Sequence, residues 1–499
     1  MKKGVFLGIF GTFMLILGVF CFGYLYFGNG LNNKTFPSGI TINGIDVSGL
    51  DKNQAVNLVA SKLTDRRKDI AITLKYDDKI WELSGQDFEI DNQISPYVES
   101  VFDYFNSGNI FDRHAKQQNA KTNNSFNISY AKILGGLDAK IDSIASEIDI
   151  DAKDSEVVFD AKKKNPLSFT HDSNGVVVDK ESLKTNLDDL LQTNTEVSVI
   201  IPTYNVSPQV TKVENENTYA LRGKFQTSFA SSSSDRKFNI KHALDSFNGK
   251  AFLPNEEVSF NQTTGSRTAE NGYKKANIIL NGVYVEGTGG GVCQASTTLY
   301  NALLCADIEI LEVNKHTLPS SYIWLAFDAM VSEGYSDLRF KNNTDKNLYI
   351  KTYTDNENAY VEVYGKKFAD GEKVVRRVEY LGVVPHSGDR IVQDTTGQYS
   401  SKVTYKGEYY RLKYPREGYR AKGYIDRYID GELVESKLIR NETYQPQEGI
   451  IIEGVEEITE GITLPPNTVI FIAPQDQSKT TPKNVQTKLE KENPSNLNP

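Results

Sequence analysis

The sequence predicts a multidomain α+β protein that starts with a transmembrane helix and has a β-rich module near its C-terminus. Three observations support this fold class. The 499 residues exceed what one core usually organises, an apolar run follows the first lysines, and stretches of helical and strand periodicity alternate along the chain. The predicted parts are an anchor over 1–27, an α+β region over 37–212, a mixed α+β domain over 217–366, a β-rich module over 367–457 and a disordered tail over 475–499.

The anchor is predicted from Lys2 and Lys3 and the apolar run over residues 4–26 that follows them. These about 23 residues are enough to cross a hydrocarbon core of ~30 Å. The basic flank is expected to stay in the cytoplasm, and no small-x-small cleavage site follows the run. We therefore expect a single-pass cell-membrane protein whose C-terminal ectodomain lies on the extracellular side, with Cys21 facing lipid.

The region over 37–212 alternates strand and helix patterns. Residues 40–47 are typical of a strand, and Asp51 with Gln54 forms a predicted capping box at the start of a helix. Later, Asp179 is a predicted N-cap and residues 197–201 form a short apolar strand that stops at a proline. These patterns also fit a spacer or binding module that carries no chemistry.

Composition excludes several functional classes. The net charge of −9 argues against a general nucleic-acid binder, which would show a basic face. Three cysteines are too few for a disulfide-stapled scaffold. The five histidines and the cysteines form no cluster with metal-ligand spacing, so we expect neither a metal nor another cofactor.

The string GTGGGVCQASTTLYNALL contains the candidate nucleophile, Cys293. Gly289, Gly290 and Gly291 allow positive φ and close backbone approach, and residues 296–304 are predicted to be helical. A thiol near a helix N-terminus has a lowered pKa, and the amides around the glycine turn could stabilise an oxyanion. Cys305 has the spacing of a buried hydrophobe on the same helix. A Cys293–Cys305 disulfide would have to span roughly 15 Å of helix, which is too far.

A cysteine nucleophile usually needs a base and a group that orients the base. His316 is the first candidate for the base and proton shuttle, and His242 is the second. Asp328 and Asp337 could orient a histidine or bind an amine, and Arg267 could hold a substrate carboxylate through a bidentate contact. Ser296, one turn after Cys293, is also predicted to bind substrate. The alternative interpretation is that Cys293 only packs and that His316 is structural.

Residues 225–365 resemble the VanW-like family. The matching pieces are RKFNIKHAL, FLPNEEVSFN, TGSRTAENGYKKANII, GGGVCQASTTLYNALL and YSDLRFKNNTDKNLYI. The chain departs from the family pattern in Asn255, where the family has a glycine, and in having one histidine, His316, where the family has two. The glycine change affects a turn, whereas the second departure leaves His316 as the sole histidine of that motif.

Two flanking stretches also carry resemblances. Residues 137–211, with an Asn174-Gly175 turn and the closing string VIIPTYNVSPQVT, resemble a peptidoglycan-binding domain often found before VanW-like domains. The stretch GYIDRYIDGELVESKLIRNETYQP is similar to the five-glycine-type β module of bacterial surface proteins, without most of the glycines. In this stretch Asp430-Gly431 predicts a hairpin turn.

Together these resemblances imply an L,D-transpeptidase of Gram-positive bacteria. Cys293 would form a thioester with a peptidoglycan stem peptide and pass it to a second stem, which makes a 3–3 cross-link. The implied partners are stem peptides, glycan and the membrane, with no nucleic acid. Two alternatives stay open: a non-catalytic peptidoglycan-binding or scaffold protein, and a cysteine carboxypeptidase or amidase that trims stem peptides.

Overall fold

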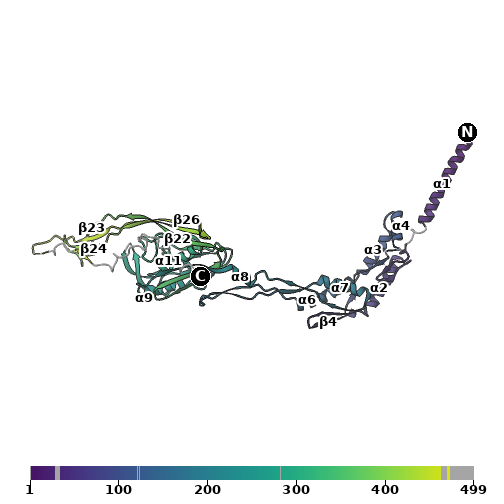
Figure 1. Ribbon diagram of the computed structural model, residues 1–499, viewed down its shortest axis with the longest axis horizontal. Coiled ribbons are helices and arrows are strands. Elements are labelled where there is room, and N and C mark those ends of the chain that lie inside the picture. Colours follow the sequence, from purple (N-terminus) through teal and green to yellow (C-terminus); the bar gives the residue numbers. More distant parts are fainter. Residues whose placement is uncertain are drawn as a thin grey trace. The chain divides into compact units, whose positions relative to one another are not determined.

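The structure is a computed structural model that describes residues 2–28, 34–120, 122, 124–280, 283–461, 463 and 469–471. The tail predicted over 475–499 lies outside these residues. The chain divides into two compact units, shown in Figure 1. The first comprises Met1–Asp154 and Asp172–Gln209, and the second comprises Ser155–His171 and Val210–Pro499.

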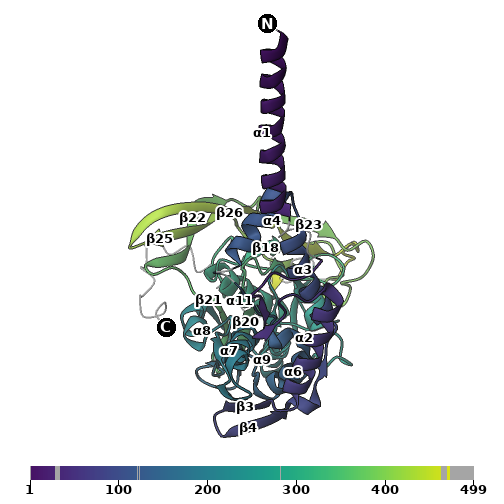
Figure 2. The same ribbon diagram turned by 90° about the vertical axis from the view of Figure 1, so that its right-hand side faces the viewer.

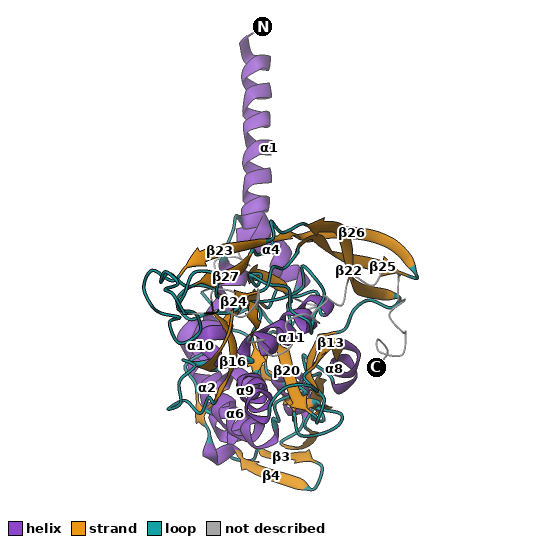
Figure 3. Cartoon of the chain, turned by 90° about the vertical axis from the view of Figure 1, so that its left-hand side faces the viewer, coloured by secondary structure: helices purple, strands orange, loops and turns teal. Residues whose placement is uncertain are grey.

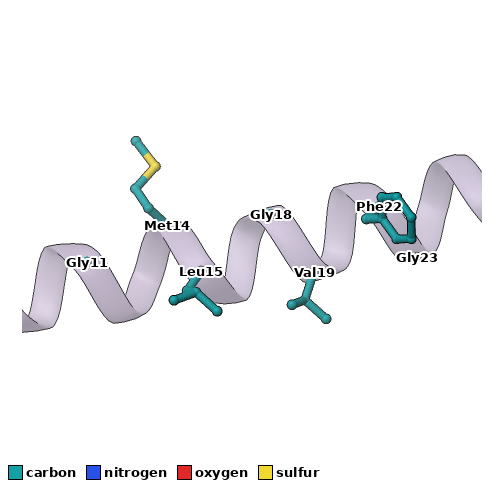
Figure 4. Close-up of a pocket in the computed structure, with 7 residues that line it drawn as sticks. All are labelled: Gly11, Met14, Leu15, Gly18, Val19, Phe22 and Gly23. Atoms are coloured by element: carbon teal, nitrogen blue, oxygen red, sulfur yellow. The ribbon is translucent and has the colours of Figure 1, made fainter.

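The predicted anchor falls on helix α1 (Lys2–Gly28). Its side chains are described over residues 10–23, so both ends of the predicted span over 4–26 lie outside the described side chains. Among the residues that the structure describes, none of the helices combines the length and the apolarity that crossing a membrane requires. A shallow hollow on α1 is lined by Gly11, Met14, Leu15, Gly18, Val19, Phe22 and Gly23 (Figure 4).

The first unit is an α+β fold with its own hydrophobic core. Its further helices are α2 (Lys52–Arg67), η1 (Gly85–Asp87), α3 (Ile94–Asn106), α4 (Ile110–Asn119), α5 (Tyr130–Ile133), α6 (Leu137–Ile148) and α7 (Lys180–Thr193). Its strands are β1 (Thr41–Ile42), β2 (Ile45–Asp46), β3 (Ala71–Tyr76), β4 (Lys79–Ser84), β5 (Glu89–Ile90), β6 (Ser125–Phe126), β7 (Leu134–Gly135), β10 (Gly175–Val178), β11 (Glu196–Ile200) and β12 (Thr203–Val206). Strand β11 pairs in parallel with β3, and β3 pairs antiparallel with β4.

Helix capping in the first unit follows the sequence signals. The carboxylate of Asp51 accepts from the Gln54 amide at 2.8 Å, and the Gln54 side chain accepts from the Asp51 amide at 3.1 Å, so the predicted capping box at the start of α2 is confirmed. Asp179 likewise accepts from the amide of Ser182 at the start of α7. Helices α2 and α3 then pack their apolar faces into the core (Figure 2).

The single strand predicted over residues 40–47 is wrong. The chain turns back at Asn43 and Gly44, whose φ angles are 48° and 75°, and this makes the short hairpin β1–β2. An Asn-Gly pair adopts positive φ at little cost, and such a pair joins antiparallel strands. The sequence-based prediction missed this turn because the apolar residues on both sides of it suggested one continuous strand.

The second unit is built around a sheet with the strand order β13-β21-β20-β14. These strands are β13 (Tyr219–Ser228), β14 (Ala251–Phe252), β20 (Leu348–Thr354) and β21 (Asn358–Lys366). Helices α9 (Ser234–Asp245) and α11 (Val292–Cys305) pack on this sheet and on each other (Figure 3). Their shared core includes Ile240, Leu299, Val361 and Val363, so the position of α11 is fixed by burial.

Smaller elements surround that core. They are α8 (Lys212–Thr218), α10 (Phe260–Thr264), β8 (Val157–Phe159), β9 (Leu167–Phe169), β15 (Glu257–Ser259), β16 (Lys275–Leu280), β17 (Val283–Thr288), β18 (Glu309–Glu312) and β19 (Arg339–Lys341). The hairpin β8–β9 lies within the sequence region 37–212 but belongs to the second unit. There the ring of Phe159 stacks on Tyr349 with centroids 4.9 Å apart.

The C-terminal part of the second unit is β-rich, as predicted. Long strands β22 (Glu372–Val384), β25 (Gly418–Ile429) and β26 (Glu432–Tyr444) form one antiparallel sheet (Figure 2). A second sheet contains β23 (Asp389–Gln393), β24 (Tyr409–Lys413), β27 (Gly449–Glu453) and β28 (Val469–Phe471). The predicted hairpin turn between β25 and β26 is confirmed, because Asp430 and Gly431 have φ of 50° and 85°. We call residues 372–453 the C-terminal β module.

Candidate active site

A tight glycine turn places Cys293 in the first turn of α11. Gly289 and Gly291 have φ of 83° and 109°, a region that side chains rarely tolerate. A Cβ atom on Gly290 would lie 2.7 Å from the carbonyl oxygen of Asn277 on β16. The glycines therefore let the chain pass against β16 and enter α11 at Val292.

The amides of the glycine turn are occupied only in part, because the described chain shows no backbone acceptor for those of Gly290 and Gly291. The Gly289 amide donates to the Lys274 carbonyl at 3.0 Å, so, contrary to expectation, it has no hydrogen to offer an oxyanion. The amides of Val292 and Gln294 donate to carbonyls of the turn at 3.2 and 2.8 Å. Within the described chain the structure shows no backbone acceptor for the Cys293 amide. That amide is a candidate oxyanion donor at the helix N-terminus, together with the amides of Gly290 and Gly291.

His316 and Asp328 are brought together by an isolated β-bridge between their two segments. An antiparallel bridge joins Asn314 to Met330, with the Met330 amide donating to the Asn314 carbonyl at 2.7 Å. Moving two residues inward from each side of this bridge reaches His316 and Asp328, which therefore face each other on the same side. The side chains of Thr297 and Asn301 on α11 bond to backbone groups of Ala329 and Phe327, which fastens this segment to the helix that carries Cys293.

The three side chains form a Cys-His-Asp constellation. The Nδ1 atom of His316 lies 2.7 Å from Oδ2 of Asp328, and the same oxygen accepts from the His316 amide at 2.5 Å. The His316 imidazole also interacts electrostatically with the Cys293 thiol, whose Sγ atom lies 3.3 Å from the Val331 carbonyl oxygen. Asp328 is 1% exposed and His316 is 8% exposed, whereas Cys293 is partly exposed. Cys293 is thus the least buried residue of the three.

The electrostatics favour a charged thiolate and imidazolium. Burial alone would raise the pKa of the Cys293 thiol, but the hydrogen bond and charge of His316, with a smaller effect from Arg267, lower this pKa overall. Burial opposes the charge on His316, but Tyr322, Asp328 and Cys293 raise its pKa well above the ordinary value. The lowered thiol pKa favours the thiolate and the raised imidazole pKa favours the imidazolium, and these are the charge states of a reactive cysteine–histidine pair.

Arg267 is the second predicted residue that the structure brings near the thiol. Its charge acts on Cys293, and its Nη2 atom donates to the side-chain oxygen of Asn261. The buried Nε and Nη1 atoms of Arg267 have no hydrogen-bond partner among the described residues. They are buried donors without an acceptor in the described part of the chain, and guanidinium donors of this kind match a carboxylate.

The remaining predicted site residues make their hydrogen bonds within the fold. Ser296 is fully buried and donates to the carbonyls of Cys293 and Ala329 at 3.0 and 2.6 Å, so it is a fastening residue rather than a substrate-binding one. His242 lies 2.9 Å from the Asn271 carbonyl. Asp337 accepts from Ser259 and from the Asn261 amide. No disulfide joins Cys293 to Cys305 among the described cysteines, as expected.

Tyr444 and Arg440 are site residues that sequence reasoning missed. Both lie on β26 of the C-terminal β module, and the Tyr444 hydroxyl donates to Oδ1 of Asp328 at 2.5 Å. Arg440 donates to the Asp328 carbonyl and lies 3.8 Å from Oδ1. More than a hundred residues separate them from Asp328, and no local motif links the two positions.

The lowered pKa of Cys293 predicts unusual alkylation kinetics. Because only the thiolate reacts, iodoacetamide should modify Cys293 at pH values where an ordinary cysteine, with a pKa of about 8.5, is largely protonated. We expect the rate at pH 6.5 to exceed that of a model thiol by about tenfold or more. Mass spectrometry of the native full-length chain measures this rate. A profile with its midpoint at the ordinary thiol pKa would contradict the ion pair.

Comparisons with known proteins identify two regions of the chain. Residues 235–364 match the family described as "VanW like protein". Residues 81–198 match the family described as "Putative peptidoglycan binding domain". The first range contains the Cys-His-Asp constellation and Arg267. Arg440 and Tyr444, the two residues of β26 that bond to Asp328, lie outside it.

Two curated relatives and one solved structure are similar to parts of the chain. The uncharacterized protein YoaR of Bacillus subtilis (strain 168) is 38% identical over 153 residues, which is 30% of this chain and 50% of that protein. The vancomycin B-type resistance protein VanW of Enterococcus faecalis (strain ATCC 700802 / V583) is 30% identical over 141 residues, 27% of this chain and 50% of that protein. The crystal structure of HP0197-G5 is 19% identical, covering 17% of this chain and 97% of that chain, with a TM-score of 0.10.

The chain thus spans about half the length of each curated relative. Both family matches agree with the resemblances that the sequence motifs carry, and they fall in the expected order along the chain. This protein therefore contains a VanW-like domain, preceded by a region of the peptidoglycan-binding-domain type.

Proposed function

We propose that the chain is a cysteine-dependent L,D-transpeptidase that forms 3–3 cross-links in peptidoglycan. The observation that carries this proposal is the Cys293-His316-Asp328 constellation, with the nucleophile in the first turn of a helix. The match to a peptidoglycan-binding family supports a cell-wall substrate. Acyl transfer needs a nucleophile, a proton carrier and an oxyanion donor, and these residues can supply all three.

The acylation half-reaction begins with the Cys293 thiolate. It attacks the carbonyl carbon of the diamino acid at the third stem position, and a carbon–sulfur bond forms. The oxyanion of the tetrahedral intermediate is held by the Cys293 amide. When the intermediate collapses, the bond to the terminal D-alanine breaks, and the His316 imidazolium donates its proton to the leaving amine. The product is a thioester, and Asp328 keeps the imidazole oriented throughout.

The second half-reaction transfers the acyl group to an amine. The side-chain amine of a second stem attacks the thioester carbonyl, and His316 accepts the proton that this amine loses. The carbon–sulfur bond then breaks, which regenerates the Cys293 thiolate and leaves the new amide cross-link. The two steps balance without an oxidant, a metal or a nucleotide. Water in place of the amine would give a carboxypeptidase instead.

Arg267 is the proposed anchor for the donor substrate. Its Nε and Nη1 atoms have no acceptor among the described residues, and a carboxylate can accept from two guanidinium donors at once. The terminal D-alanine carries such a carboxylate next to the scissile bond. Arg267 would therefore place a stem with a free C-terminus across the Cys293 thiolate.

The remaining parts of the proposal concern location. We propose that residues 37–212 hold the glycan, that residues 217–366 carry the chemistry, and that the apolar sequence over 4–26 anchors the chain in the cell membrane with the ectodomain on the wall side. The basic residues Lys2 and Lys3 and the helical backbone of α1 support the anchor. Membrane fractionation with alkali extraction tests it, because an anchored chain stays in the pellet.

The proposed activity is tested with purified disaccharide-tetrapeptide and the full-length chain. Mass spectrometry of the products should find released D-alanine together with a dimer cross-linked between the third residues of both stems. Trimmed monomer without dimer would establish the carboxypeptidase instead. Unchanged substrate, with Cys293 shown to be accessible by alkylation, would establish the non-catalytic wall-binding alternative and refute the transferase.

A further inference from the structure

Asp328 is held from two sides, and one of these sides is the C-terminal β module. Its Oδ2 atom accepts from the backbone and ring of His316 at 2.5 and 2.7 Å. Its Oδ1 atom accepts from the Tyr444 hydroxyl at 2.5 Å. A carboxylate bonded through both oxygens cannot rotate without losing a hydrogen bond, so the module fixes the plane in which Asp328 meets the imidazole.

Tyr444 is itself fixed. Its side chain is 1% exposed, and its hydroxyl accepts from the Ala326 amide at 3.0 Å while donating to Asp328. Its ring packs with Leu325, Ala326 and Ala421, which joins β25 to the segment that carries Asp328. Arg440, which is 7% exposed, donates to the Asp328 carbonyl and so holds the backbone of the same residue.

Further contacts fasten the module to the VanW-like domain. The Nη1 atom of Arg376 on β22 donates to the side-chain oxygen of Asn301 on α11 at 2.7 Å, and its guanidinium lies 4.1 Å from the ring centroid of Phe225. Arg427 on β25 pairs with Asp307, just past the end of α11, at 2.5 Å. The Arg376–Asn301 contact is buried, so separating it would leave the buried Arg376 guanidinium without this acceptor, whereas the Arg427–Asp307 pair is partly exposed.

We propose that the C-terminal β module is a structural part of the catalytic centre, in which Tyr444 and Arg440 are positioning residues that hold Asp328 and, through it, His316. Neither residue touches the reacting atoms. This inference rests on the proposed role of Cys293 as the nucleophile. It assigns the module a function in catalysis in addition to any ligand that its exposed strands bind.

The effect should appear in the pH profile of Cys293. Without its Tyr444 donor, the Asp328 carboxylate is less well ordered and stabilises the His316 imidazolium less, so the thiolate needs a higher pH to form. The titratable and charged groups that face this chain of contacts are Arg267 at the thiol, Tyr322 at the imidazole, and Tyr300, Arg440 and Tyr444 at the carboxylate. Among these, Tyr444→Phe removes a hydroxyl and changes no charge.

The test is the rate of iodoacetamide modification of Cys293 against pH in the full-length chain. For Tyr444→Phe we expect the midpoint to rise by about 0.5 to 1 pH unit, so that the rate at pH 6 falls about three- to tenfold. Tyr424→Phe is the matched control, because the Tyr424 hydroxyl on the same sheet donates to Glu379 at 2.8 Å. The control profile should coincide with that of the wild type.

Each outcome has a distinct meaning. A lowered wild-type midpoint with an unchanged Tyr444→Phe profile overturns the positioning role and leaves the proposed function standing. An ordinary wild-type profile together with no cross-linked product overturns both. Circular dichroism and a thermal transition show whether Tyr444→Phe is folded. Should it unfold, Arg440→Lys carries the same test, with the midpoint again expected to rise.

Discussion

Replacing Cys293 with alanine should abolish product formation while leaving the fold intact. The alanine cannot form a thioester, and loss of a triad nucleophile commonly lowers turnover by at least about 10⁴-fold. The fold should survive, because Cys293 is partly exposed and its thiol makes only a long contact, of 3.3 Å, with the Val331 carbonyl. Product rates measured by mass spectrometry and unfolding followed in urea separate the two effects.

Cys305→Ala is the matched control for this substitution. Cys305 ends the same helix, so the variant makes the same chemical change in α11 at a distance from the glycine turn. Its product rate should equal that of the wild type within about twofold. Product formation by Cys293→Ala at the wild-type rate would remove Cys293 from the mechanism.

Asp328→Asn should have the second largest effect, on both activity and stability. The asparagine side chain keeps the size of the carboxylate but leaves the His316 imidazolium without its counter-charge. Its NH2 group is a donor, so it cannot accept a hydrogen bond from the donors on the side that it faces. An Asp→Asn change at the orienting position of a triad lowers turnover by about 10⁴-fold in the best-studied case. Breaking a buried pair also costs about 3 kcal/mol of unfolding free energy. Steady-state rates and urea unfolding measure both.

Asp337→Asn distinguishes loss of the Asp328–His316 contact from loss of any hydrogen-bonded carboxylate in this segment. Asp337 follows Asp328 in the same segment, but its oxygens accept from Ser259, from the Asn261 amide and from the Leu338 amide. We expect the alkylation profile of Cys293 to stay unchanged in this variant, whereas in Asp328→Asn the midpoint should move upward. If both variants raised the pH midpoint of Cys293 alkylation equally, this result would argue against a specific Asp328–His316 interaction.

The parts of the fold that the sequence predicted are those encoded by neighbouring residues. The capping box at Asp51 and the hairpin at Asp430-Gly431 each depend on a few adjacent side chains, and both are confirmed. The strand prediction over 40–47 failed because apolar residues on both sides of Asn43-Gly44 suggested continuous pairing. The Asn-Gly pair adopts positive φ readily, and it therefore turned the chain at this point.

The local structure around the candidate nucleophile could be predicted from the sequence, whereas the groups that surround it could not. The glycine turn and the helix that follows it are local, so they pointed to Cys293 from sequence alone. The pairing of His316 with Asp328 depends on the bridge between Asn314 and Met330, and no local pattern predicts that register. Ser296 lies in the first turns of the same helix as Cys293, but helical geometry turns its hydroxyl inward to the Ala329 carbonyl.

The contacts between β26 and Asp328 could not be predicted from the sequence. Tyr444 reaches Asp328 because the sheet of β22, β25 and β26 packs against residues 325–328, and this contact is a product of tertiary folding. Tyrosines are common in this chain, with 27 in all. Nothing in the local sequence of β26 distinguishes the one that bonds to a buried carboxylate.

The most direct test of the central claim is the intact mass of the full-length chain, trapped by acid within the first turnover with disaccharide-tetrapeptide. We predict a covalent adduct on Cys293 that increases the mass of the protein by the mass of the substrate minus that of D-alanine. This adduct should be discharged by hydroxylamine, as a thioester is, and should be absent from Cys293→Ala. Cross-linked product that accumulates in single-turnover experiments without any adduct on Cys293 would contradict the thioester mechanism.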